Sequence, residues 1–166
     1  MIYLPFYGDT KSVLFEELLF RGALLYILVQ KLGARNGIIL SSLCFGVYHW
    51  YTYGVFGNFA IMAFVLIMTA IPGLVFAYAF VKTKSMALAI GLHLGWNFTN
   101  NSIFANGSWS DYYILIPQVP QTGIETMPHL AGMPINYLFN VLLANIMLPL
   151  LTYLVLKYYY SQSKDK

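Results

Sequence analysis

The chain has very few charged residues. Asp, Glu, Lys and Arg make up 9% of its 166 residues, whereas a soluble domain carries about 25%. Hydrophobic residues make up 59%, and the mean hydropathy is +0.65. This composition excludes an ordinary soluble domain and indicates an integral membrane protein. The small net charge of +3 gives no reason to expect a nucleic-acid partner.

Cysteine is almost absent as well. The single cysteine, Cys44, lies in an apolar segment and is expected to be a small packing residue. The N-terminus has no basic region followed by an apolar one, so a cleaved signal peptide is not expected. Because there is no internal repeat or low-complexity tract, residues 1–166 are predicted to form a single membrane-embedded domain.

Long apolar runs separated by short polar hinges predict an all-α bundle of about five transmembrane helices, since a helix needs roughly 20 residues to cross the bilayer core. Pro72 and Gly73 are expected to kink the third and most apolar helix. Prolines, glycines and aromatics in residues 102–134 predict an interfacial loop. The predicted helices cover about residues 12–32, 36–53, 57–81, 85–101 and 135–158.

Basic residues gather on one side of this predicted bundle. The positive-inside rule makes that side cytoplasmic and places the C-terminus in the cytoplasm. The expected location is the cell membrane of a prokaryote. The residues concerned are Lys31, Arg35, Lys82, Lys84, Lys157, Lys164 and Lys166.

Five ionisable side chains are predicted at membrane depth, where each costs roughly 2.5–3.5 kcal/mol. Glu17 and Arg21 are four residues apart, in the favourable order for an ion pair on one helical face. Glu16 points about 100° away from that face and is therefore available as a catalytic group. Alternatively, both glutamates only complement the helix dipole. The five are Glu16, Glu17, Arg21, His49 and His93.

His93 and Asn97 share a face of the fourth predicted helix. The opposite face carries the small residues Ala87, Gly91 and Gly95, which are expected to press against a neighbouring helix. His93 and Asn97 would then face a cavity, although hydrogen bonding between helices is the alternative for this pair.

The polar groups of three predicted helices fall at a similar depth. At about 1.5 Å per residue, Glu16 and Asn97 lie about 6 Å from the non-cytoplasmic end, and His49 lies equally deep. His93 lies about 12 Å from that end. This agreement predicts one site, nearer the non-cytoplasmic face.

A carboxylate, two imidazoles and an amide match hydrolysis by an activated water. Glu16 would be the general base with one histidine, while the other histidine and Asn97 would stabilise the oxyanion. Glu16, His49 and His93 are also a sufficient ligand set for catalytic zinc. The contiguous HExxH spacing is absent, so zinc and no cofactor both stay open.

Three stretches carry a family resemblance. "EELLFR", "FGVYH" and "HLGWN" resemble, in this order, the motifs EExxxR, FxxxH and HxxxN of the CAAX protease and bacteriocin-processing (CPBP or Abi) family. This family of intramembrane proteases includes the type II CAAX prenyl endopeptidases. The resemblance covers residues 16–97.

The resemblance implies an intramembrane endopeptidase acting on a peptide or lipidated protein substrate, and it leaves metal dependence open. It implies that Glu16 activates water with His49 as its partner. His93 and Asn97 would lie on the oxyanion side. The supporting residues it implies are Glu17, Arg21 and Phe45.

Two features depart from the resemblance. In members of the family, further membrane spans usually precede the first motif, whereas only fifteen residues precede Glu16 here. The chain is then a short member, a fragment, or a subunit that completes its helix bundle by forming a homo-oligomer. In addition, a prenylated cytosolic tail would need access from the cytoplasmic side, whereas the predicted site lies nearer the non-cytoplasmic face.

Two other functions remain as alternatives. A non-catalytic membrane protein, such as a bacteriocin-immunity protein or scaffold, would use the same polar cluster to hold helices together. A proton or ion carrier is the third possibility, but one polar cluster does not form a relay across the membrane.

Overall fold

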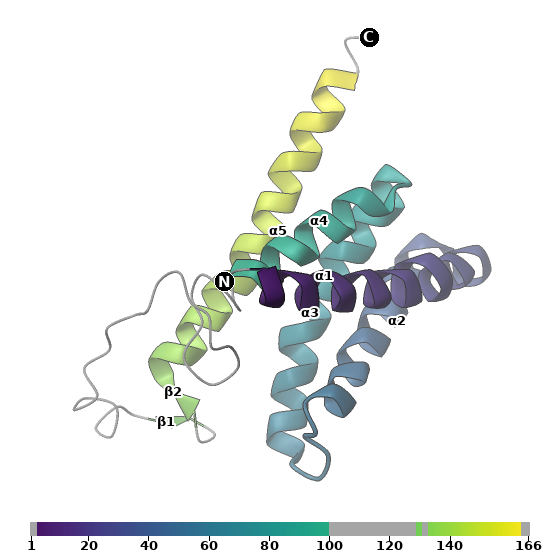
Figure 1. Cartoon of the computed structure of the whole chain (residues 1–166). Coiled ribbons are helices and arrows are strands. Elements are labelled where there is room, and N and C mark those ends of the chain that lie inside the picture. The colour runs from purple at the N-terminus through teal and green to yellow at the C-terminus, as the bar shows by residue number, and fades with distance from the viewer. Residues whose placement is uncertain (1–2, 100–128, 131–132, 164–166) are drawn as a thin grey trace.

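The computed structural model describes residues 3–99, 129–130 and 133–163. This part of the chain is all-α apart from one short antiparallel strand pair (Figure 1). The helices are α1 (Tyr3–Glu17), the π-helical segment η1 (Leu18–Leu25), α2 (Tyr26–Thr52), α3 (Phe59–Thr83), α4 (Met86–Phe98) and α5 (Ile135–Ser163), and the strands are β1 (His129–Leu130) and β2 (Met133–Pro134).

The first helical rod runs through α1 and η1 into α2 and is broken at Gly33. This residue has φ 79° and ψ 166°, a conformation that side chains with a Cβ rarely adopt. The predicted break between the first two helices is therefore present. The first helix begins earlier than predicted, at Tyr3 rather than at residue 12.

Side-chain caps fix the starts of the next two helices. The Asn58 side chain accepts a hydrogen bond from the backbone N–H of Ile61, and the Ser85 hydroxyl accepts one from Ala87 N–H, both at 3.2 Å. Such caps satisfy backbone donors that the first helical turn leaves open. α3 is continuous through Pro72.

Glycines allow α2 and α3 to approach each other closely. A Cβ on Gly46 would lie 2.7 Å from Leu66 Cδ1, and a Cβ on Gly73 would lie 3.1 Å from Phe45 Cδ1. This close approach lets dispersion contacts form along both helices, which is the usual role of small residues between membrane helices. It also brings Phe45 against α3.

The small residues of α4 do not have the predicted role. Ala87, Gly91 and Gly95 are exposed, and no atom lies within 4 Å of a Cβ built on Gly91 or Gly95. The prediction that they press against a neighbouring helix is wrong. α4 instead buries Ala89 and His93, and it packs against α1 and α3.

α5 packs on α3 through a small apolar cluster. Val75, Phe76, Ala89 and Leu148 form this cluster at the junction of α3, α4 and α5. In Figure 1, α5 extends beyond the other helices towards the C-terminus.

One helix in the described part of the chain, α3, is both long and apolar enough to cross a membrane. Met86–Phe98 and Asn145–Tyr158 are shorter apolar helical stretches. The all-α prediction is confirmed for these residues. The predicted interfacial loop, residues 102–134, lies outside the described residues except for β1 and β2.

Candidate active site

Two adjacent carboxylates and an arginine are buried where α1 passes into η1. Glu17 is 0% exposed and Arg21 is 1% exposed, and Glu16 is also buried. Arg21 Nη1 lies 3.2 Å from Glu17 Oε1, so the expected ion pair is present. Burial of charged groups requires such compensation.

The Arg21 guanidinium joins this segment to the two following helices. Its Nη2 donates a hydrogen bond to the Gly73 carbonyl of α3 at 3.3 Å. Its central carbon lies 4.4 Å from the centroid of the Phe45 ring and 5.2 Å from that of Phe76. Cation–π contacts are strongest where water is excluded, as it is around this buried side chain.

His93 of α4 contacts both glutamates. Its Nδ1 lies 2.8 Å from Glu17 Oε1, and since an ionised carboxylate only accepts, Nδ1 carries the proton in this bond. Its Nε2 faces Glu16 Oε2 at 3.7 Å, which is too long for a direct hydrogen bond. The Phe76 ring stacks on the imidazole at 4.7 Å with an interplanar angle of 19°. Glu17 and Phe76 therefore fix the orientation of this ring.

Glu16 has a second contact on its own helix. The Ser12 hydroxyl donates a hydrogen bond to Glu16 Oε1 at 3.0 Å, which leaves Oε2 directed at His93. Only Glu17 pairs with Arg21, whereas both carboxylates face the same imidazole, that of His93.

His49 of α2 lies beside this cluster and packs against the Phe45 ring. Its Nδ1 donates a hydrogen bond to the Phe45 carbonyl at 2.8 Å, so the neutral ring presents Nε2 as an acceptor. The Phe45 ring centroid is 4.6 Å from that of His49 and 5.8 Å from that of His93.

Asn97 lies one turn after His93 on α4 and is half-buried. In the described residues no hydrogen bond joins it to the cluster. Of the predicted site residues, the structure thus brings Glu16, Glu17, Arg21 and His93 into contact. It places Phe45 and His49 next to them.

The donors for the zinc alternative are not assembled. In the described ranges no three His, Cys, Asp or Glu side chains are positioned to hold one metal ion. Glu16 and His93 approach each other, whereas the third donor considered, His49, packs edge-on against the Phe45 ring and uses Nδ1 in a hydrogen bond to the Phe45 carbonyl. The residues present therefore do not fit a three-ligand site.

Three contributors were absent from the sequence prediction. Ser12 is four residues before Glu16, a spacing that could have indicated their hydrogen bond. Phe76 and the Gly73 carbonyl carry no such signal, because their role depends on how α3 packs.

This arrangement defines a class of protein. It is an apolar helical protein in which carboxylates and a histidine from distant parts of the chain meet in a buried polar centre. Such centres mark functional sites in membrane proteins.

The comparison with protein families specifies the class further. The model of the family described as type II CAAX prenyl endopeptidase Rce1-like matches residues 10–99, more than half of the chain. The chain belongs to this family, which confirms the predicted resemblance and implies a CAAX-type intramembrane protease. The matched range includes every residue of the candidate site. No curated protein and no solved structure matches the chain.

Proposed function

We propose that the protein is an intramembrane endopeptidase that hydrolyses a peptide bond of a peptide or lipidated protein with a water held between Glu16 and His93. The observation that carries this proposal is the 3.7 Å separation of Glu16 Oε2 from His93 Nε2. A water to one side of this pair would lie about 2.8 Å from both atoms and bridge them. Family membership supports the reaction class.

The hydrogen bonds around His93 suit it to orient this water. In the tautomer that donates Nδ1–H to Glu17, Nε2 is an acceptor. The water would donate one hydrogen to Nε2 and the other to Glu16, which directs its oxygen lone pairs at the scissile carbonyl. Here His93, rather than His49, is the partner of Glu16.

The proposed reaction is a general base hydrolysis. Glu16 takes a proton from the water as its oxygen attacks the carbonyl carbon. The Asn97 amide donates to the oxyanion of the tetrahedral intermediate. When the C–N bond breaks, Glu16 returns the proton to the leaving nitrogen. His49 lines the substrate side, where its Nε2 is available to accept a hydrogen bond from the substrate.

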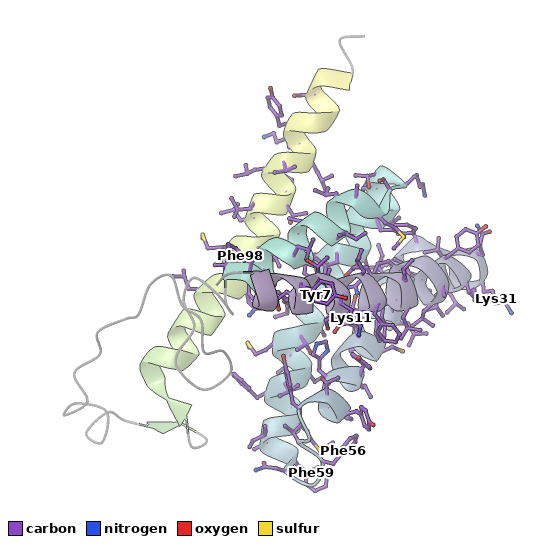
Figure 2. The ribbon with its side chains drawn as sticks, viewed as in Figure 1. Tyr7, Lys11, Lys31, Phe56, Phe59 and Phe98 are labelled. Carbon is purple, nitrogen blue, oxygen red and sulfur yellow. The ribbon has the colours of Figure 1, made fainter. Side chains whose placement is uncertain are left out.

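We further propose that the helices form about five membrane spans with the C-terminus in the cytoplasm. Large hydrophobic side chains are exposed along every helix whose side chains are described except α4, as expected of lipid-facing surfaces. Figure 2 shows Phe56 and Phe59 at the tip of the α2–α3 turn, where aromatic residues suit an interface, and Lys31 at a separate turn.

Cleavage of a mixed peptide library tests the proposed reaction. The purified protein in nanodiscs is incubated with prenylated and unmodified peptides, and products are identified by mass spectrometry. Glu16→Gln keeps the shape but removes the base, so we expect cleavage to fall about 10²- to 10⁴-fold. Asp9→Asn makes the same change on the same helix and should leave cleavage intact. Equal turnover by Glu16→Gln and the wild type would falsify the assignment.

The polar contacts between helices also support a second candidate function, that of a non-catalytic scaffold such as an immunity protein. Glu17, Arg21 and His93 link η1 and α1 to α3 and α4. For a scaffold, Glu16→Gln and His93→Gln lower the unfolding midpoint and the wild type yields no product.

A further inference from the structure

An apolar groove lies between α3 and α5, apart from the buried cluster. Its volume is about 290 Å³, near the lower end of ligand pockets. α3 contributes Leu74, Val75 and Tyr78, and α5 contributes Thr152 and Tyr153. The Thr152 hydroxyl donates to the Leu148 carbonyl of its own helix at 2.9 Å. The lining therefore suits a hydrocarbon chain.

Two lysines lie at one end of this groove. Lys82 Nζ is 5.6 Å from the centroid of the Tyr78 ring, and Lys157 Nζ is 5.9 Å from that of Tyr153. Both tyrosines line the groove, and each lysine follows its tyrosine by one helical turn. Since α3 and α5 run in the same direction in Figure 1, the helix ends that carry Lys82 and Lys157 lie on the same side of the groove.

The described helices α3 and α5 contribute only basic charged residues to this end. Neither α3 nor α5 contains an Asp or Glu, and Lys84 follows α3 directly. Basic pockets between membrane helices on the cytoplasmic side attract anionic lipid headgroups. The two tyrosines have the apolar body and polar tip that suit the boundary between headgroup and chain.

We propose that this groove binds an anionic phospholipid, with an acyl chain against Leu74 and Val75 and the phosphate between Lys82 and Lys157. The inference rests on the membrane embedding proposed above and is independent of proteolysis. A bound lipid would brace α5 on α3. Its chain would contact Val75, whose neighbour Phe76 stacks on His93.

Lipid retention tests the charged end of the groove. The full chain is placed in nanodiscs of equal parts phosphatidylcholine and phosphatidylglycerol, extracted with mild detergent, and its bound lipids are counted by native mass spectrometry. We expect the wild type to retain phosphatidylglycerol preferentially. Lys82→Gln and Lys157→Gln should each lower this preference about fivefold. Lys31→Gln removes the same single charge elsewhere and should leave this preference unchanged.

Filling the groove gives a second test that does not depend on charge. Leu74→Trp places a large ring in the groove, whereas Leu150→Trp places one on an exposed position of α5 outside it. Only Leu74→Trp should lose the retained phosphatidylglycerol. Addition of glycerophosphate should displace nothing, since it lacks acyl chains.

Three results would overturn the lipid site. They are equal retention of both lipids by the wild type, equal losses from the control and groove variants, and displacement by glycerophosphate. Because retention is read without any substrate, preferential phosphatidylglycerol binding by a protein that cleaves nothing would support the lipid site while counting against the proposed protease.

Discussion

Helices meet in two contrasting ways in this protein. Where α1 and η1 meet α4, charged groups are buried at defined distances, as in the contacts of Glu17 with Arg21 and His93. Where α3 meets α5, the one side-chain hydrogen bond between described residues is the weak contact of Asn145 Nδ2 with Met68 Sδ at 3.6 Å, and the rest of the surface leaves an apolar groove with the lysines at its end. In lipid, apolar side chains gain little by exchanging lipid for protein. Polar contacts therefore determine which helices associate, and apolar contacts leave room for other molecules.

α5 illustrates the second kind of contact. Few of its described side chains are buried, among them Leu148 and Thr152. Its exposed large hydrophobic residues are Leu143, Ile146, Met147, Leu150, Leu151, Tyr153, Leu154, Val155 and Tyr158.

Removing Arg21 should break the polar contact most severely. Arg21→Ala leaves the fully buried Glu17 without its cation, so we expect a loss of about 3–5 kcal/mol in the free energy of unfolding. Unfolding by denaturant in detergent micelles measures this loss. Lys11→Ala, on the exposed side of α1, is the control. Similar losses from both variants would contradict the structural role of the ion pair, and adding Glu17→Gln to Arg21→Ala should restore part of the stability.

A pair of glycine substitutions separates the close helix contact from an open helix surface. Gly46→Ala puts a Cβ 2.7 Å from Leu66 Cδ1 and should cost about 1–3 kcal/mol. Gly91→Ala meets no atom within 4 Å and should be neutral or stabilising by up to about 1 kcal/mol. The same unfolding assay distinguishes them. If Gly91→Ala were the more damaging change, a partner would have to cover that face of α4.

The smallest effect is expected at Ser12. Ser12→Ala removes the donor to Glu16 Oε1, a contribution of about 1 kcal/mol, which would lower kcat/KM about fivefold. Ser12→Thr keeps a hydroxyl and should retain most of the activity. Because Ser12 is exposed, the unfolding midpoint should not change. An unchanged kcat/KM in Ser12→Ala would remove Ser12 from the site.

The sequence was most informative where spacing along one helix determines a contact. The four-residue spacing of Glu17 and Arg21 predicted their ion pair, and apolar runs predicted where the helices lie. It was least informative about which face of a helix meets another. Nearly all sides of α4 are apolar, so the periodicity could not show that Gly91 would be exposed.

The depth of the polar groups predicted Glu16 and His93 in one site, but helical spacing did not show that Glu17 contacts the same imidazole. An α-helical projection separates Glu16 from Glu17 by about 100°. A side chain placed between the two carboxylates can nevertheless contact both, and His93 is supplied by a helix 76 residues further along the chain. The π-helical turns of η1, with their i to i+5 bonds, were likewise not indicated by composition.

The break at Gly33 is a suitable position for inserting a tag or a reporter. The residue is exposed, its positive φ interrupts the helical rod, and a Cβ there would meet no atom within 4 Å. Exposed chain reversals accept insertions better than continuous helix does. An affinity tag or a fluorescent reporter inserted here would lie between the first two motifs along the chain without adding volume to the packed interior.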